Sequence, residues 1–571
     1  MLLVKRSDSS EEWSRAPVLV IGLDGGSWSV LDPLLQAGLM PNLARLRSEG
    51  CWGDLRSTIP PFTAPAWSTF MTGKDPGQHG VLSFFRQDLS SYAMMPGGPL
   101  ATSAALEHPT VWQLLSEAGW RVGIINVPLT YPPRPLNGFL VSGLLTPIGA
   151  SDFTYPSELA AELGHEYVIE PDYLRGIMGS FDLSQLPERD RLLADLEVTE
   201  ATRIATTLRL VAAHRPDFTM VVLASTDRIA HFFWDCLEND VLASRGGDPH
   251  SALCARVRDH FRKLDDWIGR LRGAFGDDVT VLMMSDHGFG PAARYWAHVN
   301  SWLRAEGLLR LKAGGPASWG NTAYWKAHLL RLIPAGWIKS LLPQSARRAV
   351  RRSERTADLI DWSRTEAHFV LIYANVAGVV VNLRGRQPQG CVEPGPEYEA
   401  VRDRVIAAAR EWRNPLTGDP VVNCAARREE VYHGDHVSDF PDVILELDPD
   451  FSAVATLPRG SVSRAIRGVR SGEHRSQGIF LAHGPAFRSG RVAGASIADL
   501  APTLLHLAGE PVPSDMGGEV LVQAFEPDWL ERHPVQDRVA PPDAASVSSQ
   551  PVYTAEDEAL LTRHLAGLGY L

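Results

Sequence analysis

Four separate groups of acidic and histidine side chains in this sequence have the chemistry of metal ligands. Each group follows a short apolar run or lies close to one: Asp24, Asp227 with His231, Asp286 with His287, and His474. Zinc accepts a mixture of carboxylate oxygen and imidazole nitrogen, and manganese is the next candidate. Three carboxylates and three imidazoles are too many ligands for one tetrahedral ion, so they divide naturally between two divalent ions.

Two of these groups also have ordinary structural explanations. Asp24 precedes Gly25-Gly26, where an aspartate often does no more than make a tight turn. Asp227 and His231 have the i, i+4 spacing that places both side chains on one face of a helix as a chelating pair. An N-capping aspartate beside a surface histidine would give the same spacing, so both interpretations stay open.

The other two groups differ in how strongly they indicate a functional site. An apolar run passes straight into the adjacent Asp286 and His287, which glycine follows. This is poor packing for a strand end and favours a functional site. His474 alone would look like a surface histidine. Because the carboxyl ends of parallel strands meet in one crevice, the shared placement of the groups predicts that their side chains converge.

A candidate nucleophile lies in the proline-rich segment Thr58–Gly73. Its prolines stiffen the chain, and a helix is predicted to begin just after Pro65. Thr63 would then lie at the helix N-terminus, where the helix dipole and free amides favour an anion. Thr63 is the predicted nucleophile, with an N-cap as its structural alternative. Its rivals in the segment are Ser68, Thr69 and Thr72.

The elements that must position these residues predict an α/β fold with a mainly parallel sheet. Apolar strands are expected at Pro17–Gly22, Arg121–Asn126, Phe139–Ser142, Phe218–Leu223, Val279–Met284, Asp442–Leu447 and Gly478–Ala482. Helices are expected between them, for example at Pro41–Gly50, Ala252–Gly273 and Glu399–Arg413. Continuous apolar strands that alternate with amphipathic helices are typical of a sheet covered by helices on both faces.

The same pattern predicts how the chain is divided. A flexible tail at residues 1–16 precedes an α/β metallohydrolase core made of residues 17–300 and 361–525. Residues 301–360 are predicted to form a helical basic cap. Residues 526–571 are predicted to be a linker that ends in an amphipathic helix at Ala555–Leu568.

The predicted cap is strongly basic. Between Lys326 and Arg355 it carries eight basic side chains and a single acid, Glu354. A solvated surface explains this charge as well as two more specific functions, a lid over an anionic substrate or a peripheral contact with anionic lipid head groups.

Length and charge set outer limits. With 571 residues, 44% of them apolar, the chain can bury the core of one large α/β domain with insertions, or of several domains. Its 55 basic and 67 acidic residues give a net charge of −12, which argues against a nucleic-acid polymer as partner. Bound cations would still allow it to act on anions.

The sequence also predicts where the protein resides. It has no apolar run long enough to span a bilayer, and its N-terminus lacks the features of a secretory signal. The cysteines are odd in number and form no C-x-x-C pair: Cys51, Cys236, Cys254, Cys391 and Cys424. We therefore expect neither a disulfide framework nor a thiolate zinc site, but reduced thiols in the cytoplasm.

Taken together, the motifs resemble those of the alkaline phosphatase superfamily, and most closely its type I phosphodiesterase/nucleotide pyrophosphatase branch. The matching residues are Gly22-Leu-Asp24-Gly, Thr63-x-Pro65, Met71-Thr-Gly73, Pro76-Gly-Gln-His79-Gly80, Asp227-x-x-x-His231, Asp286-His287-Gly288, His474, Phe480–Phe487, Ile497–His506 and Asp515-Met-Gly-Gly. The resemblance covers roughly residues 17 to 300 and 365 to 520.

The resemblance implies an alkaline-phosphatase-like three-layer sandwich and a metal-dependent hydrolase of phosphate esters. It assigns one ion to Asp24, Thr63, Asp286 and His287, and the other to Asp227, His231 and His474. It also implies that Thr63 attacks phosphorus and forms a covalent phospho-threonine, which water then hydrolyses. The expected substrate is a small-molecule or lipid-linked phosphate ester, and the oligomeric state stays open.

One position departs from the family pattern. Nucleotide pyrophosphatases place a phosphate-orienting asparagine 21 residues after the threonine, where this sequence has Phe84. Nucleotide specificity is therefore not implied. Lys74 and Arg86 are the nearby candidates for an alternative donor.

Several other functions compete with this interpretation. A sulfatase would need a modifiable Cys or Ser in a C/S-x-P-x-R frame, which here reads Thr63-Ala-Pro-Ala-Trp67. A metal-dependent phosphoglycerate mutase would use a serine nucleophile. A phosphonate hydrolase of the same superfamily is a third alternative. A non-catalytic, metal-bound scaffold for anionic lipid or glycan precursors is a fourth, which an intact ligand set with a nucleophile disfavours.

Overall fold

The computed structural model describes residues 15–95, 97–164, 167–170, 185–238, 249–312, 356–465, 470–540, 552–568 and 570. Most of the predicted N-terminal tail and the whole basic segment Lys326–Arg355 lie outside these residues. The predictions for the cap therefore stay predictions.

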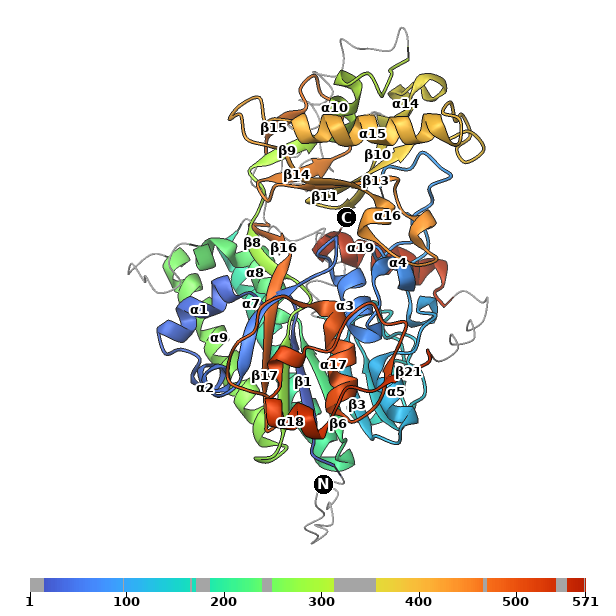
Figure 1. Cartoon of the computed structure of the whole chain (residues 1–571). Helices are drawn as coiled ribbons and strands as arrows, with labels where there is room; N and C mark the ends of the chain where they lie inside the picture. Colours follow the sequence, from blue (N-terminus) through green and yellow to red (C-terminus); the bar gives the residue numbers. More distant parts are fainter. Residues whose placement is uncertain are drawn as a thin grey trace.

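A ten-stranded sheet forms the centre of the larger lobe (Figure 1), in the order β18-β2-β17-β7-β1-β6-β3-β4-β5, with β19 paired to β2. The strands are β1 (Val18–Leu23), β2 (Cys51–Arg56), β3 (Val122–Val127), β4 (Gly138–Ser142), β5 (Thr154–Tyr155), β6 (Phe218–Leu223), β7 (Thr280–Met284), β17 (Gln477–His483), β18 (Gly490–Arg491) and β19 (Ala495–Ser496). The run β7-β1-β6-β3-β4 is parallel throughout, whereas β17 pairs antiparallel with both β7 and β2. The predicted mainly parallel sheet is confirmed.

Helices cover both faces of this sheet (Figure 1). One group comprises α1 (Trp28–Gln36), α2 (Pro41–Glu49), α7 (Leu186–His214), α8 (Ser225–Glu238) and α9 (Pro249–Gly273), in which α9 packs against α2, α7 and α8. The other comprises α3 (Thr63–Thr72), α5 (Val111–Glu117) and α17 (Leu500–Leu507), in which α17 packs against α3 and α5. The central strands are buried on both sides, which explains their unbroken apolar sequences.

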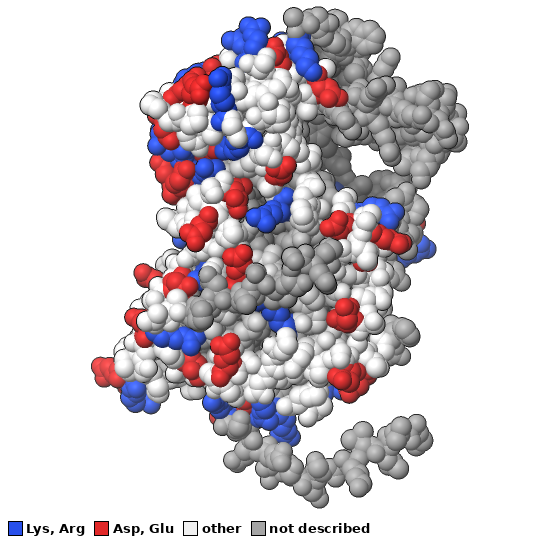
Figure 2. All heavy atoms as spheres, turned by 90° about the vertical axis from the view of Figure 1, so that its right-hand side faces the viewer, with Lys and Arg blue, Asp and Glu red and all other residues white. Residues whose placement is uncertain are grey.

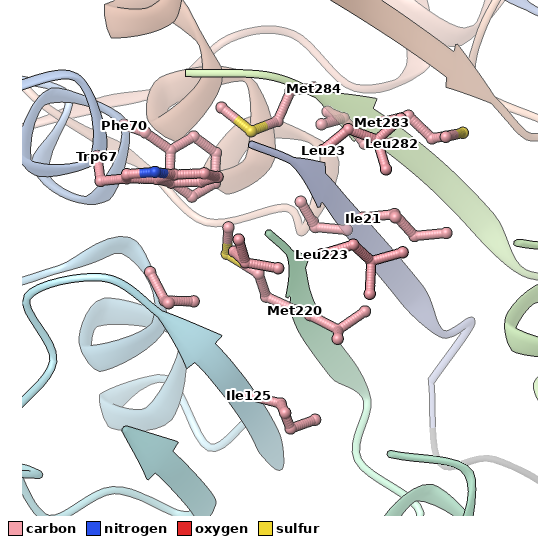
Figure 3. Packing of buried hydrophobic residues seen from close by; sticks show 14 of the residues in the cluster. Ile21, Leu23, Trp67, Phe70, Ile125, Met220, Leu223, Leu282, Met283 and Met284 are labelled. Carbon is pink, nitrogen blue, oxygen red and sulfur yellow. The ribbon is translucent and has the colours of Figure 1, made fainter. Parts of the chain in front are cut away.

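The central packing fixes the helix that carries the predicted nucleophile. Figure 3 shows Trp67 and Phe70 of α3 beside the apolar side chains of β1, β6 and β7. A Cβ atom on Gly22 would lie 2.6 Å from the Trp67 ring, so only glycine allows the indole to lie this close to β1. The Gly22 of the sequence motif therefore sets the distance between α3 and the sheet.

A second, smaller lobe is built from the later part of the chain and lies above the first in Figure 1. Its antiparallel sheet has the order β10-β11-β13-β12, formed by Ala367–Tyr373, Val376–Val381, Val443–Leu447 and Val422–Arg427. A three-stranded sheet has the order β14-β9-β15, formed by Phe451–Val454, Tyr295–His298 and Val462–Arg464. The helices α10 (Val299–Ala305) and α15 (Pro396–Glu411) complete the lobe.

This lobe has its own apolar core, which includes Trp302, Phe369, Val405 and Trp412. The strand predicted at Asp442–Leu447 is real, but it pairs within this antiparallel sheet and not within the main one. Residues 361–525 are predicted to belong to the α/β core, and the strands β10, β11, β12 and β13 of this range form a separate antiparallel sheet.

Two further observations complete the fold. The predicted C-terminal helix is present as α19 (Ala555–Leu568), and Figure 1 places it close to the junction of the two lobes. Within the part of the chain that the structure describes, no helix combines the length and the apolar character needed to cross a membrane. On the face in Figure 2 acidic and basic side chains are interspersed, which fits the modest net charge.

Candidate active site

The predicted ligands converge at the carboxyl ends of three adjacent strands. Asp24 follows β1, Asp227 lies in the first turn of α8 after β6, and Asp286 and His287 follow β7. His474 arrives separately, on the two-stranded ribbon of β8 (Gly288–Pro291) and β16 (Gly472–Arg475). All six predicted side chains are buried, none more than 1% exposed. Side chains from distant segments of the chain therefore lie together at this edge of the sheet.

The first cluster joins Asp227, His231 and His474. The two histidine Nε2 atoms lie 3.0 Å apart, and each lies 3.4 Å from Asp227 Oδ1. Ligands bound about 2.0 Å from a tetrahedral zinc ion lie roughly 3.3 Å from one another. The three atoms therefore have the spacing of a ligand set around one cation.

The other ring nitrogen of each histidine fixes which atom faces the site. The Nδ1 atoms of His231, His287 and His474 lie 3.2, 3.2 and 3.0 Å from the backbone carbonyl oxygens of Gly472, Gly288 and Pro61. A carbonyl only accepts, so for His287 and His474 this assignment puts the proton on Nδ1 and leaves a lone pair on Nε2. The Nδ1 of His231 also lies 2.6 Å from Nη2 of Arg470, which only donates, so that nitrogen has both a donor and an acceptor beside it. Metal-binding histidines are oriented in the same way by their second nitrogen.

The second cluster joins Asp24, Asp286 and His287. His287 Nε2 lies 3.3 Å from Asp286 Oδ2 and 3.8 Å from Asp24 Oδ1. The remaining oxygen of Asp286, Oδ1, accepts a 3.0 Å hydrogen bond from the Gly25 amide. Gly25 has a φ of 65°, and a Cβ there would lie 2.5 Å from the Phe289 ring. The Asp-Gly sequence is thus required both by the turn and by the site.

The pKa values of the buried candidate ligands are shifted from their usual values in ways that suit a cation site. Burial, together with the charges of Asp286 and Asp227, raises the pKa of Asp24 well above its usual value, and burial raises that of Asp286 to about 7. Burial would also raise the pKa of Asp227, but His231 and Arg228 hold it well below its usual value. Burial lowers the pKa of His287 and of His474 to about 4, so both imidazoles are neutral and able to donate to a metal.

The chemistry of the donor set fits two divalent cations. Among the candidate ligands, four buried atoms have no hydrogen-bond partner in the described part of the chain: Asp24 Oδ1, Asp227 Oδ1, Asp286 Oδ2 and His287 Nε2. Such orphaned acceptors are costly unless something else satisfies them. Within each cluster the potential ligand atoms lie within 4.8 Å of one another. A cation in each cluster would satisfy all four orphaned atoms.

Thr63 lies where the sequence predicts, with one difference. The helix begins at Thr63 itself, three residues earlier than expected, and Phe62 takes the N-cap position without a side-chain cap. Thr63 is therefore not an N-cap. Its backbone amide and that of Ala64 belong to the first turn and have no acceptor within the helix, while Pro65 has no amide to satisfy. The positive end of α3 would therefore favour an anion bound at the Thr63 hydroxyl.

Two rivals of Thr63 and both alternative donors have other partners, whereas the buried Ser68 Oγ has none among the described residues. Thr69 Oγ1 lies 3.0 Å from His79 Nε2, and Thr72 donates a 2.7 Å hydrogen bond to the Ser68 carbonyl. Lys74 forms an ion pair with Asp515, and the exposed Arg86 lies 3.8 Å from Asp439. Neither cation replaces the donor that position 84 lacks.

Sequence reasoning missed two side chains beside Thr63. Arg228, the neighbour of Asp227, is buried and forms ion pairs with Asp227 and Glu170. Tyr570, which follows α19, places its hydroxyl 3.5 Å from Thr63 Oγ1. No motif marks the tyrosine. The only signal was that an amphipathic helix at the end of the chain had to dock somewhere.

The cysteine prediction is wrong for one pair. Cys236 of α8 and Cys254 of α9 form a disulfide, although the sequence has no disulfide framework. His250 lies beside them, with its Nδ1 3.8 Å from Cys254 Sγ. Two cysteines 18 residues apart on packed helices gave no spacing signal, because the helices bring them together. Cys51, Cys391 and Cys424 are free.

Comparison with known proteins identifies the family. Residues 18–474 match the family described as type I phosphodiesterase / nucleotide pyrophosphatase. The chain belongs to this family. The resemblance inferred from the motifs is thereby confirmed, and the chain is an enzyme of the phosphoric ester hydrolase class, in a family whose members depend on divalent metals.

Solved structures agree on the fold of this family member. Phosphonoacetate hydrolase from Sinorhizobium meliloti 1021, in complex with phosphonoformate or phosphonoacetate, gives TM-scores of 0.51 and 0.50 at 16% and 14% identity. Each match covers 86% of this chain and 95% of that one. Human ectonucleotide pyrophosphatase/phosphodiesterase 5 gives a TM-score of 0.45 at 15% identity, covering 88% and 97%. The predicted alkaline-phosphatase-like architecture is confirmed.

Proposed function

We propose that this enzyme hydrolyses phosphate esters with two divalent cations, most readily zinc, and a covalent phospho-threonine at Thr63. One observation carries the proposal. In the Asp227, His231 and His474 cluster, three potential ligand atoms lie 3.0 to 3.4 Å apart, which is the spacing of ligands around one tetrahedral cation. A divalent cation at the centre would be bound by all three atoms.

The residues around the site have complementary tasks in this proposal. Divalent ions held by the two clusters would act as Lewis acids, favouring the alkoxide of Thr63 and neutralising phosphoryl charge. Thr63 Oγ1 forms a bond to phosphorus while the bond from phosphorus to the leaving oxygen breaks. The first-turn amides of α3 stabilise the negative charge. Water then attacks the phospho-threonine and restores the hydroxyl.

The test compares hydrolysis of bis-p-nitrophenyl phosphate by the zinc- or manganese-loaded enzyme and its Thr63→Ala variant. Thr63→Ala should lower kcat/KM by at least about 10³-fold, since losing a covalent nucleophile has effects of that order. Thr72→Ala is the matched control, because it removes a buried threonine hydroxyl from the same helix. A metal-binding scaffold would load metal normally and show only background turnover.

The phospho-threonine has its own test. Rapid acid quenching of the reaction, followed by peptide mass spectrometry, should find one phosphoryl group on the peptide that contains Thr63. Phosphorylation of Ser68 or Thr69 instead would identify that residue of α3, and not Thr63, as the nucleophile. Inactivity of Thr63→Ala without any trapped phospho-enzyme would favour direct attack by water.

The sulfatase and phosphonate alternatives belong in the same assay. The nucleophile frame begins with Thr63, which cannot be converted to formylglycine, so p-nitrophenyl sulfate should be turned over far more slowly than the phosphate diester. Phosphonoacetate is included because phosphonoacetate hydrolase shares the fold. We propose small phosphate diesters as the preferred class, and comparison with p-nitrophenyl phosphate separates diester from monoester preference.

A further inference from the structure

We propose that Tyr570 and Arg228 together bind the non-bridging oxygens of the substrate's phosphoryl group, supplying the donor that Phe84 cannot provide. This proposal rests on the function proposed above. It gives a specific role to a residue that follows the last described helix, α19, and to the arginine next to a predicted metal ligand.

The Tyr570 hydroxyl lies between the nucleophile and the first cluster. It lies 3.5 Å from Thr63 Oγ1 and 3.3 Å from Asp227 Oδ2, and it accepts a 3.0 Å hydrogen bond from Arg228 Nη1. A donor this close to Oγ1 is also within hydrogen-bond reach of the oxygens of a phosphoryl group joined to Oγ1. The phenol is thus close enough to contact the group being transferred.

Both side chains have a donor to offer. A phenol is protonated at neutral pH, and the Tyr570 hydroxyl donates its hydrogen to Asp227. Arg228 forms an ion pair with the same carboxylate. Rotation of the hydroxyl would redirect this hydrogen to an incoming oxygen. The buried Arg228 Nε has no hydrogen-bond partner among the described residues. A guanidinium is always charged and is well shaped for phosphate oxygens.

The guanidinium of Arg228 is held by two carboxylates. Arg228 Nη2 lies 3.0 Å from Glu170 Oε1, and Nη1 pairs with Asp227. Glu170 therefore holds the guanidinium from behind, as a positioning residue. A fully buried arginine is costly unless partners hold it, and here Glu170 and Asp227 keep the guanidinium of Arg228 3.0 Å from the Tyr570 hydroxyl.

Phe84 packs against the ring of Tyr570, the residue that we propose as the donor. Its ring centroid lies 5.2 Å from that of Tyr570 and 5.0 Å from that of Phe62. Phe62 in turn lies 5.4 Å from Tyr570, edge to face. The position at which relatives carry an amide is here part of an aromatic wall that orients the tyrosine ring.

Tyr570→Phe is the decisive variant because it keeps the ring in this wall and removes only the oxygen. Calorimetry with inorganic phosphate and zinc-loaded protein should show affinity weakened about 10-fold or more, since a hydrogen bond to a charged group is worth about 1.5–3 kcal/mol. For the diester assay kcat/KM should fall roughly 10- to 100-fold. Zinc content should not change.

Tyr553→Phe is the matched control. It removes another buried phenol from the same end of the chain, one that donates to the Leu145 carbonyl at 2.9 Å and does not approach Thr63. It should leave phosphate affinity and kcat/KM as in the wild type. Arg228→Lys keeps the charge but loses the planar fork, and it should weaken phosphate binding provided that its thermal unfolding remains cooperative.

Two results would overturn the proposal. Phosphate affinity and kcat/KM of Tyr570→Phe within about threefold of the wild type would make the hydroxyl dispensable. A rise in activity would mean that the phenol obstructs the site. A failure of the proposed hydrolase function would give a different result, because Thr63→Ala would then be as active as the wild type. Phosphate calorimetry with Tyr570→Phe would still test whether the phenol binds phosphate.

Discussion

The two lobes differ in how their strands run, and this difference decides where the chemistry lies. In the larger lobe β7, β1 and β6 are parallel neighbours, so their carboxyl ends deliver Asp286, Asp24 and Asp227 to one edge. In the second lobe β10, β11, β13 and β12 are antiparallel, so their ends alternate between opposite edges. That lobe contributes none of the six predicted ligands.

The comparison is clearest for two buried aspartates. Asp286 has an oxygen without a partner and a pKa raised to about 7 by burial. Asp442 of the second lobe accepts hydrogen bonds from Arg386 at 2.5 and 2.8 Å and from Tyr398 at 2.7 Å, and these partners lower its pKa although burial opposes them. Asp286 therefore has an oxygen available for a cation, whereas both oxygens of Asp442 accept hydrogen bonds within the second lobe.

The largest expected effect is that of Asp286→Asn. Metal analysis should find about one zinc ion per chain in place of two, and diester kcat/KM should fall by at least about 10³-fold. Because Asp24 and Asp286 repel each other in the absence of cations, the metal-free variant should unfold at a higher temperature than the metal-free wild type. Full zinc content and activity in Asp286→Asn would contradict the assignment.

Asp442→Asn is the counterpart in the second lobe. It leaves Arg386 and Arg428 without their buried carboxylate, and breaking such a pair costs about 3–5 kcal/mol of stability. Denaturant unfolding should show this loss, while the folded fraction keeps two zinc ions and nearly normal kcat/KM. Loss of zinc in this variant would mean that the lobes are not separate in function.

The sequence anticipated the larger lobe better than the second, for a physical reason. An apolar run that ends in Asp or Asp-His reveals both a buried parallel strand and the edge where its side chain emerges, as at Leu23-Asp24. The run Asp442–Leu447 has the same apolar character, but nothing in it specifies an antiparallel partner. The contributions of Tyr570 and of the Cys236–Cys254 pair depend on tertiary contacts alone.

Tyr373 is where the second lobe reaches the site, and its variant should have an intermediate effect. Its hydroxyl donates a 2.6 Å hydrogen bond to Glu473, and its ring stacks on Phe62 with centroids 4.6 Å apart. Tyr373→Phe keeps the stacking and loses the hydrogen bond, which costs about 1–2 kcal/mol of stability. Steady-state kinetics should show kcat lowered only severalfold. A loss as large as that of Asp286→Asn would give the second lobe a direct chemical role.

The smallest effect concerns acid stability. Burial lowers the pKa of His368 in the second lobe to about 4, and neither of its ring nitrogens has a hydrogen-bond partner among the described residues. Below pH 6.5 the unfolded chain binds a proton that the folded histidine refuses, so stability falls as the pH falls from about 6.5 towards 4. At pH 5.5 the loss is about 1 kcal/mol.

His368→Phe should remove that part of the pH dependence. Urea unfolding at pH 7.5 and 5.5 would measure it, with kcat unchanged at pH 7.5. An equal loss of stability between the two pH values in the wild type and the variant would show that His368 is not the group that titrates.

Anomalous X-ray diffraction at the zinc absorption edge, on crystals of the zinc-loaded enzyme, tests the central claim most directly. The account predicts two strong peaks, one enclosed by Asp227, His231 and His474 and the other by Asp24, Asp286 and His287, both beside the Thr63 hydroxyl. Zinc bound only elsewhere, for example at His250, or a single peak with one cluster left without metal, would contradict it.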